Sequence, residues 1–144
     1  MSFLFDFVVR NAAGDLVLAV EAKAKLGTDA AWAQEMRSRI TSRSPIARSM
    51  ALLLVTPDRM YVWRAEAASD TAPVMLDSSI LLATHFARVG VQSGRPVDAQ
   101  VFEEIVHWWL QDLATGVCEP PIEPNFDPVT KALKGGRLLA EIAA

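Results

Sequence analysis

The run MALLLV, residues 50–55, restricts the fold of this chain more than any other stretch of the sequence. It contains no polar side chain, so a strand formed here has an apolar surface on both sides of its backbone. Such a strand suits the centre of a sheet that is covered on both faces. The sequence therefore predicts a central strand over Met50 to Thr56, with other elements packed above and below it.

Further strands are expected on either side of this run in the sequence. Apolar and alternating stretches bounded by turn residues predict strands over residues 3–10, 16–24 and 60–64. The first two form a hairpin, because the intervening NAAGD segment is rich in turn-forming residues. Thr28 or Asp29 then caps a helix that continues to about Ile40.

The second half of the sequence is expected to be mainly helical. Residues 65–76 show little periodicity and are expected to form a loop, and helices are predicted over 77–89, 98–113 and 129–143. Gly135 and Gly136 are expected to interrupt the last helix. The middle helix carries one apolar stripe, formed by Phe102, Ile105, Val106, Trp109, Leu110 and Leu113. This order of elements indicates a single α+β domain, 1–144, with a β/α core over 1–64 and a mostly helical extension over 65–144.

The composition is that of an ordinary globular chain, and its 144 residues suffice for about one domain. Hydrophobic residues make up 51%, but charges interrupt every apolar run well short of the roughly 20 residues that a membrane helix needs. No basic segment with a cleavage site follows Met1, so a cytoplasmic protein without a membrane partner is expected. The single cysteine, Cys118, is expected to be a free thiol.

Charge is distributed unevenly along the chain. Residues 1–64 contain nine Lys and Arg against six Asp and Glu, whereas residues 65–144 contain five against eleven. No acidic residue lies between Glu35 and Asp58, and the basic residues in this interval are candidate phosphate contacts. They are Arg37, Arg39, Arg43 and Arg48. The alternative interpretation of this segment is a solvated helix end and loop.

Glu21 and Lys23 are unusual because they end an apolar strand. Successive side chains of a strand alternate between its faces, so these two share a face, about 6.6 Å apart along the backbone. Pairing of the hairpin brings Asp6 close to both. Two carboxylates and the backbone carbonyl of Ala22 offer hard oxygen ligands for Mg²⁺ or Mn²⁺, beside a lysine that can orient or deprotonate water. The alternative is a surface ion pair with little effect.

This arrangement resembles the core of the PD-(D/E)XK nuclease superfamily, which includes restriction endonucleases. The resemblance covers about residues 3–64, where Asp6, a hairpin, Glu21-Ala22-Lys23, a helix and the strand ALLLV follow one another. It implies a restriction-endonuclease-like mixed sheet and a metal-dependent hydrolase that cleaves phosphodiesters. It also implies Asp6 and Glu21 as metal ligands and Lys23 as the residue that orients water. The segment VTPDRMYVWR is similar to small uncharacterised bacterial members of this superfamily.

Two features differ from the pattern of the superfamily. Phe5 stands where the proline of the motif would be. The family core also begins with a helix and a strand, and the helix often supplies a further acidic ligand, but the sequence has room for neither ahead of Phe3. The sheet edge left open by this difference must be covered, because exposed edges invite pairing. The C-terminal helices, the proline-rich arm or a second copy of the chain are the alternatives, so a homo-oligomer is expected.

Other side chains are weaker candidates. Gln34 lies on the helix after Lys23, where some relatives of the superfamily carry a glutamine that faces the active site, so Gln34 and Arg37 are candidate cleft residues. His85 and His107 have no neighbours at a spacing typical of a triad or a zinc site, and each is expected to be a structural or surface histidine. No glycine-rich nucleotide-binding loop is present.

Two functions from different classes remain open at this point. The first is a Mg²⁺-dependent nuclease-like protein that acts on nucleic acid, with DNA the expected partner. The second is a non-catalytic member of the same fold that serves as an oligomeric interaction or nucleic-acid-binding module. The acidic second half favours the module, because a nuclease surface usually has a more positive field. A cleft that joins the basic segment to Glu21 would favour the nuclease.

Overall fold

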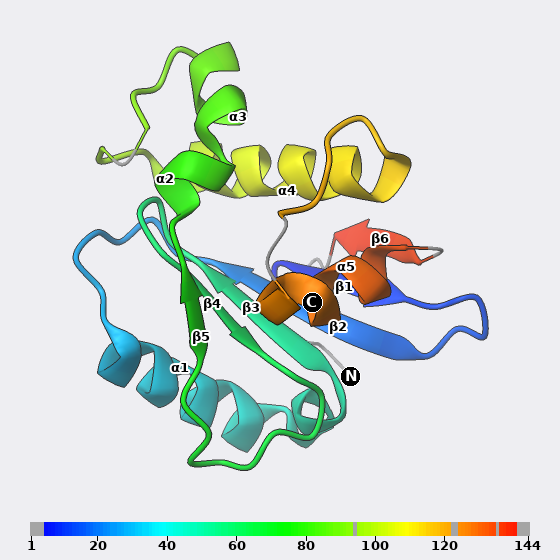
Figure 1. Ribbon diagram of the computed structural model, residues 1–144. Helices are drawn as coiled ribbons and strands as arrows, with labels where there is room; N and C mark the ends of the chain where they lie inside the picture. Colours follow the sequence, from blue (N-terminus) through cyan, green and yellow to red (C-terminus); the bar gives the residue numbers. More distant parts are fainter. Residues whose placement is uncertain (1–4, 94, 122–123, 135, 141–144) are drawn as a thin grey trace.

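The computed structural model describes residues 5–93, 95–121, 124–134 and 136–140, and it contains a six-stranded mixed sheet with helices on both faces (Figure 1). The strands are β1 (Phe7–Arg10), β2 (Leu16–Ala22), β3 (Ala51–Val55), β4 (Met60–Trp63), β5 (Val74–Leu76) and β6 (Arg137–Ala140). Their order across the sheet is β5-β4-β3-β2-β1-β6. The α+β class predicted from the sequence is therefore confirmed.

The apolar run forms β3 in the interior of the sheet, and all five of its residues are buried. It pairs with β2 in parallel and with β4 in antiparallel orientation. The parallel pair needs a crossover connection, which α1 (Ala30–Arg43) provides. Asp29 caps this helix as expected, because its side chain accepts a hydrogen bond of 2.8 Å from the backbone N–H of Trp32.

The remaining helices are α2 (Ser78–Leu81), α3 (Ala83–Arg88), α4 (Ala99–Thr115) and α5 (Asp127–Leu133), with short 3₁₀ helices η1 (Pro45–Ser49) and η2 (Pro124–Phe126). Helix α1 covers one face of the sheet, and α4 and α5 cover the other (Figure 1). The stripe predicted on α4 faces the sheet. Phe102, Ile105, Val106, Trp109 and Leu110 are all buried in the same core cluster as β1, β2 and β3 side chains.

The structure differs from the sequence prediction in three elements. β5 lies inside the expected loop, and its three residues are too few to show a period of two. The helix expected over 77–89 is two short helices divided at Leu82. The helix expected over 129–143 begins at Asp127, ends at Leu133 and is followed by β6, with Gly136 in the connection. Gly135 of the expected break and residues 141–143 lie outside the described residues.

Strand β6 occupies the edge of the sheet beside β1. The two strands are antiparallel, with Phe7 opposite Ala140 and Arg10 opposite Arg137. A segment from the C-terminal part of the chain therefore covers the edge that the sequence left open. β6 is now the terminal strand on this side of the sheet, and the homo-oligomer stays a prediction.

Gly136 connects α5 to β6 at a point where the backbone passes very close to β1. A Cβ atom at this position would overlap the backbone carbonyl oxygen of Ala132 and lie 2.7 Å from Cγ1 of Val9. Only glycine fits there without moving α5 away from the sheet.

We expect Gly136→Ala to lower the free energy of unfolding by about 2 kcal/mol, because the overlapping atoms belong to a backbone carbonyl and a buried side chain. Gly14→Ala is the matched control. Gly14 has a positive φ of 86° but open space around it, so only the strained backbone contributes, at about 1 kcal/mol. Urea denaturation of both variants measures the difference, and equal losses would contradict the close approach.

Candidate active site

Asp6 immediately precedes β1 and contacts the end of β2. Its backbone N–H donates to the carbonyl of Val20 at 3.1 Å, and its Oδ2 accepts a hydrogen bond of 2.7 Å from the N–H of Ala22. The register that pairs Phe7 with Val20 sets this position. The hairpin therefore brings Asp6 next to Glu21-Ala22-Lys23, as the sequence predicted.

Glu21 and Lys23 lie side by side where β2 ends. Nζ of Lys23 is 3.0 Å from Oε1 of Glu21. Glu21 is only 6% exposed, and its second oxygen, Oε2, is buried without a hydrogen-bond partner in the part of the chain that the structure describes. A buried carboxylate oxygen without a partner is costly, so it calls for a proton or a cation.

The pKa values of the two carboxyl groups also indicate that the site favours a proton or a cation. Burial raises the pKa of Glu21 to about 7, with a further contribution from the charge of Asp6. The charge and hydrogen bond of Lys23 and the backbone N–H of Asp6 oppose this rise. Burial also raises the pKa of Asp6, against the N–H of Ala22 and the charge of Lys23. Lys23 alone therefore does not offset the cost of holding both carboxylates charged.

A third carboxyl group, Glu103, approaches this pair from α4. Burial is the largest cause that raises the pKa of Glu103, and the charges of Asp6 and Glu104 raise it further. The charge of Lys23 lowers it. One turn later on the same helix, the ring of His107 stacks on Phe7 with 4.9 Å between centroids, which fixes α4 beside the start of β1. Sequence reasoning missed Glu103. In the sequence, Glu103 is only a carboxylate beside the apolar stripe. A stripe does not show which strand the helix packs against.

An open cleft of about 620 Å³ begins at Glu21 and Lys23 and follows α1. Side chains from the strand end, from one side of α1 and from the start of α4 line it. They are Glu21, Lys23, Ala24, Lys25, Trp32, Met36, Arg39, Ile40, Arg43 and Ala99. Two residues of the basic segment, Arg39 and Arg43, therefore share a cleft with Glu21 and Lys23.

The other candidates on α1 and after it have structural contacts elsewhere. Gln34 donates to the carbonyl of Thr71 at 2.7 Å. The buried guanidinium of Arg37 donates to the carbonyls of Ala67 and Ala68 and lies 5.5 Å from the centroid of the Trp63 ring. Arg48 lines a separate small pocket with Arg37. Neither Gln34 nor Arg37 lines the cleft at Glu21.

The two histidines have contacts within the fold. His85 is buried, and its Nε2 lies 2.8 Å from Oδ2 of Asp112, which ties α3 to α4.

Cys118 is partly exposed and is a free thiol, as expected. Within the described ranges, no cluster of three or more His, Cys, Asp and Glu side chains is arranged to hold a metal ion. A cation at Asp6 and Glu21 would therefore need backbone and water oxygens as well.

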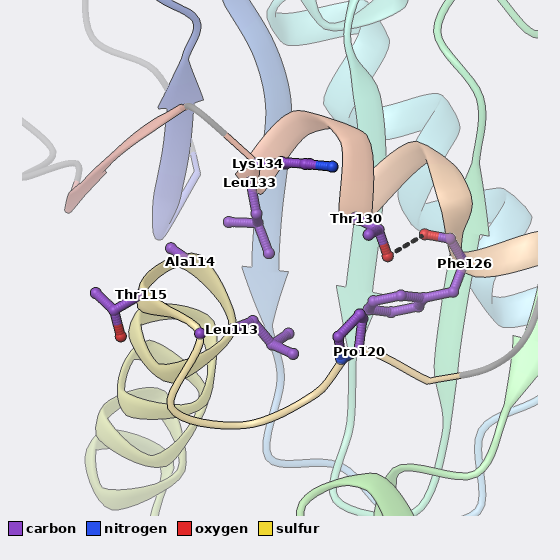
Figure 2. Close-up of a pocket in the computed structure, with 9 residues that line it drawn as sticks. Leu113, Ala114, Thr115, Pro120, Phe126, Thr130, Leu133 and Lys134 are labelled. Atoms are coloured by element: carbon purple, nitrogen blue, oxygen red, sulfur yellow. Dashed lines mark hydrogen bonds between the residues drawn. The ribbon is translucent and has the colours of Figure 1, made fainter.

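A second cavity, of about 480 Å³, lies between the end of α4, the following loop and α5 (Figure 2). Leu113, Pro120, Phe126 and Leu133 surround it, and Thr130 Oγ1 donates to the carbonyl of Phe126 at 3.4 Å. Lys134 is the one charged side chain among its lining residues. Among the described residues that line it, none is a carboxylate and none is a predicted site residue.

Comparison with known proteins gives no match to a family model, to a curated protein or to a solved structure. Among the described helices, none has the length and apolar character required to cross a membrane. The site must therefore be interpreted from its own geometry.

The raised pKa of Glu21 predicts how stability depends on pH. The folded protein holds the proton up to about pH 7, whereas the unfolded chain loses it near pH 4.5. The neutral carboxyl of Glu21 therefore makes its full contribution to the free energy of unfolding below about pH 4.5. This contribution is lost as pH rises to about 7. The full shift corresponds to about 3 kcal/mol.

We expect Glu21→Gln, which has no charge to bury, to remove this loss. Relative to the parent protein, the variant should gain stability between pH 5 and pH 8 in metal-free buffer, as measured by urea unfolding. Glu35→Gln is the control, because Glu35 is an exposed partner of Arg39 and its removal should change little. Parallel pH curves for the parent and Glu21→Gln would show that Glu21 is not the titrating group.

Proposed function

We propose that this chain is a metal-dependent, nuclease-like protein that hydrolyses phosphodiester bonds of nucleic acid. The observation that carries the proposal is the convergence of Asp6, Glu21 and Lys23 at the end of β2. Glu21 and Lys23 line a cleft that also contains Arg39 and Arg43. Carboxylates, a lysine and phosphate-binding cations in one open cleft suit attack of water on a phosphodiester.

The topology supports the resemblance to the PD-(D/E)XK superfamily. A hairpin carries the aspartate and the Glu-x-Lys segment, and a helix crosses to a parallel apolar strand. The family core has a helix and a strand ahead of its Asp-bearing strand. Here α5 and β6 provide a helix and then a strand beside β1, although they come later in the chain. Glu103, on α4, is a further carboxyl group whose pKa the charge of Asp6 raises, but it comes from a different helix than the further acid of the family core.

The residues fit a divalent cation such as Mg²⁺ or Mn²⁺. Oε2 of Glu21 is buried without a partner, and the charge of Asp6 raises the pKa of Glu21, so a cation between the two would relieve both costs. Asp6, Glu21 and the carbonyl of Ala22 would hold it, with Glu103 nearby. When bound, the cation would acidify a water molecule and stabilise the charge that develops on the phosphate.

The protein's own groups would do the rest. Lys23 Nζ, held against Glu21 Oε1, would orient the attacking water by a hydrogen bond, and the water would lose its proton to solvent. The guanidinium groups of Arg39 and Arg43 would neutralise substrate phosphates. The water oxygen forms the new bond to phosphorus, the bond to the leaving oxygen breaks, and that oxygen takes up a proton.

A second candidate function is a non-catalytic, oligomeric interaction module, or one that binds nucleic acid without cleaving it. The net charge of −3 and the excess of acidic residues over 65–144 favour it. Metal binding without cleavage of any nucleic acid would support the module over the nuclease.

We expect Mn²⁺ to stabilise the protein, by about 2.7 kcal/mol at a concentration one hundred times its Kd. Asp6→Asn and Glu21→Gln should abolish this stabilisation, and Asp70→Asn, at an exposed loop carboxylate, should not. Near neutral pH the cation should also displace the proton of Glu21. Calorimetry in buffers of different ionisation enthalpy measures this release, and Mn²⁺ binding unaltered by the first two variants would exclude the metal site.

We expect Lys23→Ala to separate metal binding from catalysis. The lysine is no ligand, and its removal takes a positive charge away from the cation, so Mn²⁺ affinity should persist or increase. Cleavage of single- and double-stranded DNA and RNA should fall by two or more orders of magnitude, as expected when the attacking water loses the group that orients it. Loss of Mn²⁺ binding in Lys23→Ala, with an unchanged fold, would contradict the assigned role.

A further inference from the structure

The side of α1 that faces the cleft combines aromatic and basic groups in a fixed order. Trp32, Met36, Arg39 and Arg43 all line the cleft, at intervals of four, three and four residues. They therefore form one continuous row along the helix. Arg39 and Arg43 are one turn apart, about 6 Å along the helix axis. One strand of nucleic acid that follows this row would pass from Trp32 to the two arginines.

The ring of Trp32 is held in place from inside the protein. It packs against Tyr61, with centroids 6.1 Å apart, and Tyr61 is fully buried, with its hydroxyl 2.8 Å from that of Thr28. Toward the cleft, Nζ of Lys25 lies 5.8 Å from the centroid of the Trp32 ring. Lys25 is exposed, so a base can replace it over the ring while the ammonium moves to a phosphate.

The cleft suits a single strand better than a duplex. It offers four cations, Lys23, Lys25, Arg39 and Arg43, of which Lys23 pairs with Glu21 and Arg39 with Glu35. A duplex is usually held by many phosphate contacts across a broad basic surface. Its bases are also stacked on one another, so an aromatic ring inside a cleft reaches only an unpaired or flipped base.

We propose that this cleft binds single-stranded nucleic acid, with an unpaired base stacked on Trp32 and neighbouring phosphates on Arg39 and Arg43. The inference rests on the proposed function, since it names the substrate form for the same site. It assigns to Trp32 a role that neither the metal site nor the hydrolytic step requires. Single-stranded DNA and RNA both offer bases that can stack and phosphates that can bind arginine, and comparison of their binding affinities distinguishes them.

The experiment measures binding of a labelled twelve-nucleotide DNA, the same sequence as RNA, and the DNA duplex, by fluorescence anisotropy with EDTA present. We expect either single strand to bind at least tenfold more tightly than the duplex. Trp32→Leu should weaken single-strand binding by about tenfold, as expected for the loss of one stacked base, and Trp32→Phe should retain most of it. Replacing Arg39 and Arg43 with glutamine should flatten the log–log salt dependence by about 1.4.

Trp108→Leu is the matched control. Trp108 is also partly buried and also has a cation over its ring, Arg88 at 5.3 Å, but it packs against His85 and does not line the cleft. Its replacement should leave binding unchanged. Circular dichroism melts of each variant show whether the fold is retained.

Two outcomes would overturn the inference: duplex bound as tightly as single strands, or Trp32→Leu equal to Trp108→Leu in binding. A separate Mn²⁺-dependent cleavage assay distinguishes this failure from that of the proposed function. Tight single-strand binding without cleavage leaves the inference standing and contradicts the nuclease. Cleavage by a protein that binds the duplex more tightly than single strands would support the nuclease and overturn the inference.

Discussion

The hydrogen bond from the N–H of Ala22 to Oδ2 of Asp6 joins the two ends of the first hairpin at the candidate site. Asp6 lies just before β1, and Ala22 is the last residue of β2. The bond therefore replaces a ladder contact where the regular pairing ends. Because one oxygen of Asp6 is held in this way, its charge stays beside Glu21 and adds to burial, the larger cause, in raising the pKa of Glu21.

The neighbouring elements shield these carboxyl groups partly from solvent. The apolar strand β3 continues the sheet beyond β2, and Lys23 is tied to it by a bond of 2.8 Å from its N–H to the carbonyl of Val55. Helix α4 packs over the start of β1 through His107 and Phe7. Burial from both layers is the largest cause of the pKa shifts of Asp6, Glu21 and Glu103, and the cleft along α1 leaves Lys23 accessible.

The parts of the structure that sequence could predict are those determined by neighbours in the chain. A hairpin register follows from a short loop, so the approach of Asp6 to Glu21 and Lys23 was predictable. The cap at Asp29 and the stripe on α4 are also local patterns. The pairing of β6 with β1 and the approach of Glu103 to Asp6 depend on where distant segments dock, and one sequence contains no such information. For the same reason, the basic segment could not be divided into the cleft residues Arg39 and Arg43 and the structural Arg37.

The pairing of β1 with β6 also has a consequence for synthesis on the ribosome. β1 leaves the exit tunnel before every other described element, and β6 follows after all of them. Until then, β1 is an edge strand next to a hairpin that has already formed, and it can pair with any extended chain nearby. Joining the two requires closure of a very long loop, so this contact should form late in folding. A nascent or truncated chain that lacks β6 would therefore have most of the sheet but would expose the β1 edge to chaperones and to aggregation.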